Sequence, residues 1–303
     1  MGTSERILQL KEEKDVVSLA HYYVDGEVQE LADFVGDSYA LAKKATQVEQ
    51  KNIVFAGVTF MGESAKLLNP QKHVYMVDDT AGCRMADMIT VEQIRDVHGK
   101  HPEAAVVCYV NSSAEVKAES DVCVTSSNAV RVVEKLPQKQ IYFIPDNHLA
   151  HFVAKSLPEK EFIFHNGFCP THEMIKPEDV RAAKQAHPDA PVLAHPECTA
   201  DTLELADYIG STAEIIRYAK EHVAKEYIIA TEIGVFHQLE KENPNIIFYP
   251  VTDFQVCPNM KKVSLIKLER TLEELEQRQE IILDAQLMER AKLPLERMLE
   301  LAK

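Results

Sequence analysis

Three cysteines recur at nearly equal intervals along this chain and could together hold a metal centre. Cys83, Cys169 and Cys257 are separated by 86 and 88 residues, and each follows an apolar run and opens a related segment. No two of the six cysteines form a CxxC pair, so the sequence contains no local zinc ribbon or ferredoxin motif. Any metal site must therefore be assembled by folding.

Three thiolates leave one coordination position of a tetrahedral or cubane site free. Zinc with water or histidine in that position is one candidate. A [4Fe–4S] cluster is the other, because a large cube suits thiolates from three separate loops and its uncapped iron is a Lewis acid. Proline directly after Cys169 and Cys257 also resembles the Cys-Pro ending of bacterial ferredoxin clusters. The alternative is that a cysteine is a buried small hydrophobic residue, as we expect for Cys108, Cys123 and Cys198.

A second repeated pattern pairs a polar residue at the end of an apolar run with a hydroxyl residue 17 positions later. The pairs are His21 with Ser38, Tyr109 with Ser126, and His195 with Thr212. Each hydroxyl residue stands where a helical pattern begins, so it could simply cap its helix. Helix N-termini that converge on one cleft would instead bind a carboxylate or a phosphate, because they offer free N–H donors and positive dipole ends. The pattern therefore predicts a pocket for a small anionic substrate.

Further candidates for chemistry lie close to these positions. Tyr23 and Glu197 each follow one of the repeated histidines by two residues, and a phenol or a carboxylate beside a metal is suited to proton transfer. As isolated residues, they would more often be solvent-exposed polar side chains. His172 lies three residues after the second cysteine of the triplet, so we expect it near any metal that this cysteine binds.

The elements that would carry these residues repeat three times. Each unit contains short runs rich in Val, Ile and Phe, such as NIVFAGV, QIYFIPD and EYIIATE, which alternate with helical patterns. Such runs indicate strands of parallel sheets that are buried on both faces, with ligand-facing residues beyond their carboxyl ends. The predicted fold class is α/β, with three pseudo-symmetric αβα sandwich domains whose short parallel sheets surround a central cavity.

We predict domain boundaries at the repeated cysteines. The predicted domains are residues 1–83 together with C-terminal helices in 264–303, residues 84–169, and residues 170–263. No Gly/Ser-rich linker separates the units, so we expect one rigid three-part body. The segment from Leu268 onward is helical in pattern, opens with a capping box from Thr271 to Glu274, and is expected to pack onto the first domain.

Composition restricts the partners and the location. The chain has 33 basic and 48 acidic residues, a net charge of −15, which repels a nucleic-acid backbone and an anionic lipid surface. No apolar run reaches the roughly 18 residues of a membrane span, and the N-terminal segment lacks the apolar stretch of a signal peptide. We therefore expect a cytoplasmic protein with reduced thiols and with no nucleic-acid or membrane partner.

Several segments, taken together, resemble the quinolinate synthase family of bacteria and archaea. Between about residue 18 and residue 265 they are, in order, LAHYYVDGEVQELADFVGDS, VDDTAGCRMADMI, CYVNSSAEVKAESD, TSSNAV, PDNHLA, CPTHEMI, HPEC, GSTAEII and VCPNMK. The resemblance implies the three-domain fold around a [4Fe–4S] cluster held by Cys83, Cys169 and Cys257. It also implies condensation of iminoaspartate with dihydroxyacetone phosphate to quinolinate, with loss of phosphate and two waters, in de novo NAD biosynthesis. The open iron would assist dehydration as a Lewis acid.

The resemblance also implies roles for the remaining candidates. Tyr23 and Glu197 would serve in proton transfer, and His172 would assist near the cluster. Substrate carboxylates, phosphate or ketone oxygens would be held by His21, Ser38, Tyr109, Asn111, Ser126, His195 and Thr212. The enzyme that supplies iminoaspartate would be a transient partner. The segment VTDFQVCP lacks the additional cysteines that some family members carry before the third ligand, which argues against a disulfide switch there.

Two other interpretations stay open at this point. Diphthamide-synthesis radical enzymes look similar in domain plan, with one cysteine per domain around a [4Fe–4S] cluster, but they use S-adenosylmethionine to modify a protein. The anion-binding motifs at the helix starts favour a metabolite instead. The second is a nonenzymatic iron–sulfur or zinc protein with a sensor pocket, against which Tyr23 and Glu197 beside an open coordination position argue.

Overall fold

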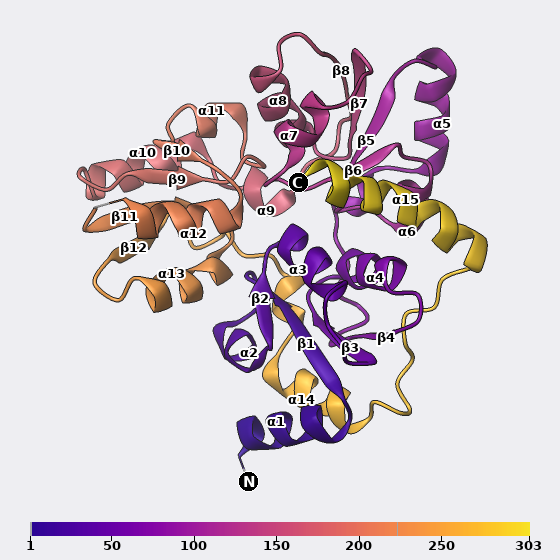
Figure 1. The fold of residues 1–303 in the computed structure, drawn as a ribbon. Coiled ribbons are helices and arrows are strands. Elements are labelled where there is room, and N and C mark those ends of the chain that lie inside the picture. The colour runs from indigo at the N-terminus through magenta and orange to yellow at the C-terminus, as the bar shows by residue number, and fades with distance from the viewer. Residues whose placement is uncertain (1, 223) are drawn as a thin grey trace.

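Three four-stranded parallel sheets form the framework of the computed structural model, which describes residues 2–222 and 224–303 (Figure 1). The strands of the first sheet are β1 (Val16–His21), β2 (Phe34–Gly36), β3 (Asn52–Ala56) and β4 (His73–Met76). Those of the second are β5 (Ala105–Tyr109), β6 (Val122–Val124), β7 (Gln140–Ile144) and β8 (Glu161–Phe164). Those of the third are β9 (Val192–Ala194), β10 (Tyr208–Ile209), β11 (Glu226–Ala230) and β12 (Ile247–Pro250). The predicted α/β fold class is confirmed.

The three sheets are equivalent in strand order and in register. In each, the second strand of the unit pairs with the first, the first with the third, and the third with the fourth. Near their carboxyl ends the first and third strands pair through Ala20 with Ala56, Cys108 with Ile144, and Ala194 with Ala230. Because parallel strands end at the same edge of a sheet, equivalent residues of the three units occupy equivalent places beyond that edge.

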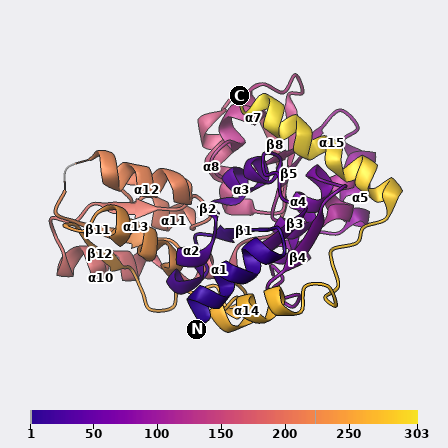
Figure 2. The same cartoon turned by 60° about the horizontal axis from the view of Figure 1, so that its bottom comes forward.

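Helices connect the strands within each unit (Figures 1 and 2). The first unit contains α1 (Thr3–Glu13), α2 (Gly26–Leu31), α3 (Ser38–Ala45) and α4 (Thr59–Leu68). The second contains the 3-10 turn η1 (Ala86–Met88), α5 (Val91–Lys100), α6 (Ala114–Ala118), α7 (Ala129–Glu134) and α8 (Asn147–Ser156). The third contains α9 (Pro170–Glu173), α10 (Pro177–Ala186), α11 (Ala200–Leu203), α12 (Thr212–Glu221), α13 (Phe236–Glu242), and the 3-10 turns η2 (Ile233–Val235) and η3 (Met260–Lys262).

Helix α12 shows how the sequence sets a boundary and a buried face. The Ser211 side chain accepts the N–H of Glu214, whose carboxylate in turn accepts the N–H of Ser211, which completes a capping box. Ile215, Ile216 and Ala219 then lie on the buried side at helical spacing. The cap fixes where the helix begins, and the apolar stripe fixes which side faces the sheet.

The first two units share one hydrophobic core, whereas the third has its own. The shared core extends from Leu19 of β1 to Phe143 of β7. In the third unit, Ile228 and Ile229 belong to two separate clusters, because neighbouring residues of a strand point to opposite faces of the sheet. Tyr23 of the first unit packs against the second of these clusters, so the units meet there. Figure 2 shows the third unit set to one side of the other two.

The C-terminal segment differs from the prediction. Helix α14 (Leu265–Glu273) begins after its cap residue Ser264 and packs on α1 and α2 of the first unit, but Thr271 lies inside this helix rather than at a start. Helix α15 (Ala285–Leu301) lies instead across α6 and β6 of the second unit and α4 of the first (Figure 1). We predicted that the C-terminal helices pack onto the first domain. This prediction is wrong for α15, because most of its contacts are with the second unit. Amphipathic spacing indicates that a helix has a buried face, but not which neighbour covers it.

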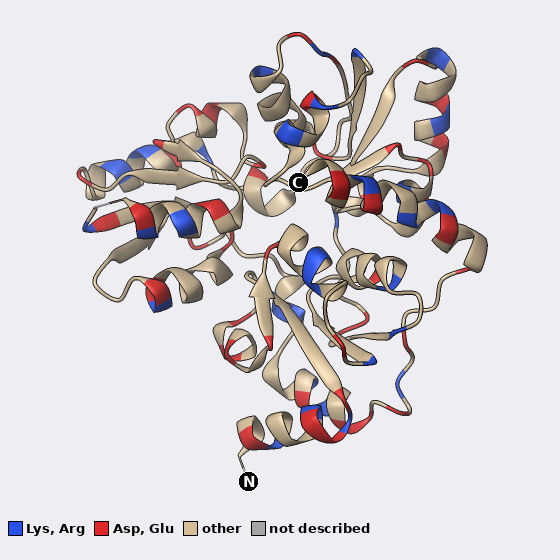
Figure 3. Cartoon of the chain, viewed as in Figure 1, with Lys and Arg blue, Asp and Glu red and all other residues tan. Residues whose placement is uncertain are grey.

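Charged residues lie mainly on the outer helices and loops (Figure 3). Many of their ion pairs are exposed, such as Lys100 with Asp96, and pairs of that kind add little to stability. Among the described residues, none of the helices is long and apolar enough to cross a membrane.

Candidate active site

One cavity of about 180 Å³ collects every site residue selected from the sequence. Its lining combines side chains from the strand ends and helix starts of all three units. The predicted residues found in it are His21, Tyr23, Ser38, Cys83, Tyr109, Asn111, Ser126, Cys169, His172, His195, Glu197, Thr212 and Cys257. Residues that are far apart in the sequence thus face one another around a space large enough for a small metabolite.

The two repeated histidines are held in the same way. The N–H of Tyr23 donates to Nδ1 of His21 at 3.1 Å, and the N–H of Glu197 donates to Nδ1 of His195 at 3.3 Å. A neutral ring that accepts at Nδ1 carries its proton on Nε2. Burial lowers the pKa of both histidines to about 3, so both are neutral donors at neutral pH. Nε2 of His195 lies 3.2 Å from Oγ of Ser126.

The hydroxyl residues at the helix starts are not the helix caps. Helix α3 is capped by the side chain of Asp37, and α12 is capped by Ser211. Ser38 and Thr212 occupy the first helical positions, where their hydroxyls are available to the cavity. Ser126 lies three residues before α7 and likewise lines the cavity. The capping interpretation is therefore wrong for these three hydroxyls, because neighbouring residues occupy the cap positions.

Asn111 presents an unused acceptor. It follows Tyr109 by two residues, just as Tyr23 follows His21 and Glu197 follows His195. Its Oδ1 is buried and has no hydrogen-bond partner among the described residues. A buried amide oxygen without a donor is unfavourable, so a ligand donor would fit here.

Glu197 is the centre of the hydrogen bonds in the cavity. Its Oε1 accepts from the hydroxyl of Tyr109 at 2.6 Å, and its Oε2 lies 2.7 Å from Nδ1 of His172. Burial by itself would raise the pKa of Glu197, but the adjacent His172 and the bond from Tyr109 outweigh it and hold the pKa below its ordinary value. Burial and the negative charge of Glu197 raise the pKa of Tyr109 well above its ordinary value. A carboxylate acceptor and a phenol donor therefore lie side by side.

Tyr23 is bonded to two threonines. Its hydroxyl lies 2.8 Å from Oγ1 of Thr212 and 2.8 Å from Oγ1 of Thr231. Oγ1 of Thr231 lies in turn 2.9 Å from Nε2 of His172. Burial and the charge of Glu197 raise the pKa of Tyr23 well above its ordinary value, so the phenol keeps its proton at neutral pH.

The three repeated cysteines share a local geometry that suits a thiolate-bound cofactor. Each is a free thiol placed just before a short helical turn, η1, α9 or η3. Backbone N–H groups two or three residues later act to lower the pKa of each thiol, namely those of Met85 and Ala86, of His172, and of Asn259 and Met260. Burial raises the pKa of all three thiols, that of Cys83 to about 12, so the thiols keep their protons at neutral pH until a bound metal centre displaces them. Three soft donors beside such N–H groups fit a [4Fe–4S] cluster.

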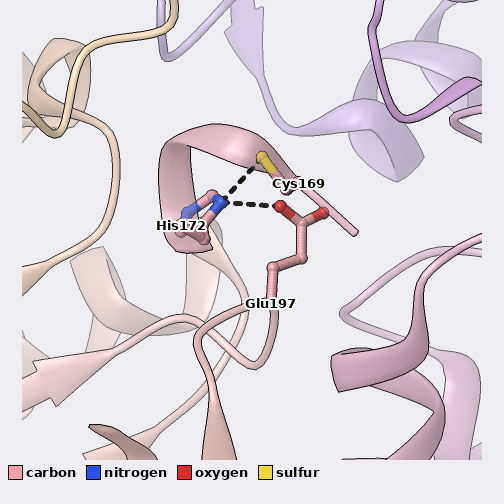
Figure 4. Close-up of side chains that lie close together, drawn as sticks. All are labelled: Cys169, His172 and Glu197. Carbon is pink, nitrogen blue, oxygen red and sulfur yellow. Dashed lines mark hydrogen bonds and ion pairs between the residues drawn. The ribbon is translucent and has the colours of Figure 1, made fainter. Parts of the chain in front are cut away.

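A second set of potential metal ligands includes one of these cysteines. One ligand atom each from Cys169, His172 and Glu197 lies within 4.8 Å of the other two (Figure 4). Nδ1 of His172 is 3.2 Å from Sγ of Cys169 and 2.7 Å from Glu197. Sulfur, nitrogen and oxygen ligands together suit zinc. Both sets need the same sulfur, so they are alternatives rather than two independent sites.

The remaining cysteines behave as expected. Cys108, Cys123 and Cys198 are fully buried and are absent from the cavity lining. Their core role is therefore confirmed.

Sequence analysis missed three residues at or beside the cavity. Arg84 is the one Lys or Arg among the described lining residues, and its place directly after Cys83 could have drawn attention to it. Glu232 accepts the N–H of Cys257 at 3.0 Å and is fully buried. Thr231 contacts Tyr23, as described above. No repeated spacing marks Thr231, because the matching residues of the other units are Gly57 and Pro145. Glu232 matches Asp146 of the second unit, which is also a buried acidic residue, so the repeat could have indicated Glu232.

Comparison with known proteins determines the family. The family model described as quinolinate synthetase A protein matches residues 5–300. The chain belongs to this family. The quinolinate synthase of Fusobacterium nucleatum is 50% identical over 301 residues, which cover 98% of this chain and 99% of that protein. That of Caldicellulosiruptor bescii is 49% identical over 295 residues, 97% of each chain, and that of Aquifex aeolicus is 46% identical over 303 residues, 98% of this chain and 94% of that protein.

Membership of the quinolinate synthetase A family confirms the resemblance found in the sequence. The family match also extends beyond the quoted motifs, through α14 and nearly to the end of α15. The C-terminal helices are therefore part of the family's shared sequence rather than an addition to it.

Proposed function

We propose that this chain is a quinolinate synthase that condenses iminoaspartate with dihydroxyacetone phosphate, releasing quinolinate, phosphate and two waters. Its place would be de novo NAD biosynthesis in the cytoplasm, and the enzyme that supplies iminoaspartate would be a transient partner. The observation that carries the proposal is the presence of Cys83, Cys169 and Cys257, one from each repeat, in the lining of one cavity. The family membership and the names of the relatives support it.

The same three cysteines would hold a [4Fe–4S] cluster. When bound, the cluster supplies a Lewis-acidic iron with an open coordination position to the substrate oxygens. The backbone N–H groups that act to lower the thiol pKa values would offset the charge of the thiolates.

Neutral donors would bind the anionic groups of the substrates. His21 offers Nε2–H, Ser38 offers a hydroxyl at the N-terminus of α3, and Ser126 lies within reach of His195. Neutral donors suit a cavity that also contains Glu197, because buried positive charges would pair with that carboxylate and leave fewer contacts for the substrate. The positive dipole ends at the helix N-termini would also attract an anion, and they do so without a protonated side chain.

Proton transfers would use Glu197 and Tyr23. Glu197 would accept a proton on a carboxylate oxygen during tautomerisation, and its lowered pKa keeps that oxygen ionised and free to accept. Tyr23 would hold and return a proton at its phenol oxygen, because its raised pKa keeps it a donor. His172 would keep Glu197 oriented through the 2.7 Å contact at Nδ1.

Metal analysis and a turnover assay test this function directly. Protein purified without oxygen is expected to contain about four iron and four sulfide per chain and to form quinolinate from the two substrates. Zinc in place of iron would favour the site of Cys169, His172 and Glu197. Ligand binding without turnover would indicate a sensor, and cleavage of S-adenosylmethionine would indicate the diphthamide-type reaction. Each of these outcomes would contradict the proposal.

Arg84 is expected to help capture substrate. Its side chain is exposed at the edge of the cavity and makes no ion pair or hydrogen bond with the rest of the described chain. We expect Arg84→Ala to raise KM about tenfold and to leave kcat nearly unchanged. A tenfold change is at the lower end of the effect on binding expected when a hydrogen bond to a charged group is lost. Added salt should reduce the difference from the wild-type enzyme.

Arg181→Ala is the matched control, because Arg181 is also exposed but lies on α10 outside the cavity lining. Steady-state kinetics in both substrates would decide. Equal KM values for Arg84→Ala and the control would remove Arg84 from substrate capture.

A further inference from the structure

Thr231 occupies a position that the other two units fill differently. It directly follows β11, whose last residue Ala230 pairs with Ala194, so Thr231 lies beside His195 at the sheet edge. The matching positions after β3 and β7 are Gly57 and Pro145, neither of which has a hydroxyl. The strand and its turn therefore form without a hydroxyl in two of the three units, and the fold by itself gives no reason for one here.

The hydroxyl of Thr231 joins two residues of the active site. It is fully buried, and its Oγ1 lies 2.8 Å from the phenol oxygen of Tyr23 and 2.9 Å from Nε2 of His172. Tyr23 comes from the first unit, so the bond also spans two units. The described side chains give the phenol oxygen of Tyr23 a single further partner, Thr212 at 2.8 Å.

This hydrogen-bond chain ends at Glu197. A carboxylate can only accept, so Nδ1 of His172 carries the proton that lies between them. Nε2 of the same ring lies 2.9 Å from Oγ1 of Thr231, so the hydroxyl of Thr231 continues the chain from His172. Oγ1 of Thr231 shares the next hydrogen bond with the phenol of Tyr23, and Thr212 is bonded to the same phenol.

We infer that Thr231 is a positioning residue that joins Tyr23 to Glu197 through His172, so that the phenol and the carboxylate meet the substrate in one fixed arrangement. The inference rests on the proposed function and deepens it. Without the hydroxyl, the phenol of Tyr23 would lose one of its two hydrogen bonds, and Nε2 of His172 would lose its partner. Each ring would then be held by fewer contacts, and small misplacements of catalytic groups are costly in rate.

The test compares variants that differ in this hydroxyl. Thr231→Val removes it at nearly constant volume, and we expect kcat to fall about 10- to 100-fold with KM for both substrates nearly unchanged. Thr231→Ser keeps the hydroxyl and should recover most of the lost kcat. In the Tyr23→Phe background, Thr231→Val should cost clearly less than in the wild type, because the two residues act through one chain.

Thr202→Val is the matched control, since Thr202 is also fully buried in the third unit but bonds to the carbonyl of Ile175 away from the cavity. Iron content and melting temperature are measured for every variant. If Thr231→Val does not fold, Thr231→Ala removes the hydroxyl without a new methyl contact. The inference would be overturned if a folded Thr231→Val or Thr231→Ala enzyme had the wild-type kcat. It would also be overturned if the losses in kcat of Thr231→Val and Tyr23→Phe were fully additive. Neither result would affect the proposed function. A wild-type enzyme that forms no quinolinate would overturn the proposed function, and this inference with it.

Discussion

Replacement of Cys169 by serine is expected to abolish both the iron–sulfur cluster and quinolinate formation, while the fold is kept. Cys169 is the cap residue of α9, a position that serine also favours, and its backbone carbonyl accepts the N–H of Glu173 in either case. A serine hydroxyl is a hard donor that does not ionise near neutral pH, so it cannot replace the thiolate. Iron, sulfide and the absorption spectrum measure the loss, and circular dichroism checks the fold.

Cys198→Ser is the control for this experiment. Cys198 is fully buried in the third unit and its Sγ contacts the carbonyl of Ala230, a bond that serine can also make. The control is expected to keep its cluster and its activity. A Cys169→Ser protein with full iron content and unchanged absorbance would show that Cys169 is not a ligand.

Glu197→Gln is expected to slow quinolinate formation about 100-fold or more, the scale of losing a general acid or base. Glutamine has nearly the same size and can still bond to Tyr109 or His172, but it carries no charge and cannot accept a proton from the substrate. Cluster content should stay at the wild-type level, because Glu197 is not one of the three cysteine ligands in the proposal.

The same variant separates the two metal hypotheses. If Cys169, His172 and Glu197 formed the metal site, Glu197→Gln would lose metal together with activity. Glu204→Gln is the control, because Glu204 is an exposed carboxylate of the same unit. This variant should keep both metal and activity. Unchanged kcat in Glu197→Gln would leave this residue with a structural role.

Much of the fold could be predicted because the chain repeats. The apolar runs correctly indicated parallel strands, since a strand buried on both faces must be apolar nearly throughout, as in β1. The spacing of 17 residues between His21 and Ser38 recurs in the other two units. In the first unit it corresponds to the path from the end of β1, through α2 and β2, to the start of α3. Equivalent sequence positions then became equivalent places at three sheet edges, which is why the cysteine triplet was visible before folding.

Other features depended on contacts and backbone geometry that sequence patterns do not predict. Whether Ser38 or Asp37 caps α3 is decided by backbone geometry within two adjacent residues, and propensity favours both types at a cap. The neighbours of α15 follow from the space left between the first two units, which no local pattern encodes. Arg84 lines the cavity because the loop of Cys83 lies there.

The sequence by itself therefore determined the strands, their threefold repetition and the residue types at each sheet edge, because these depend on local periodicity and on equivalent positions. Only the tertiary structure decided which side chains bond across the units. Tyr23 meets Thr231 from 208 residues away, and Tyr109 meets Glu197 from 88 residues away. The direction of each hydrogen bond, and the pKa of each buried group, depends on that long-range arrangement of donors and charges rather than on the residue alone.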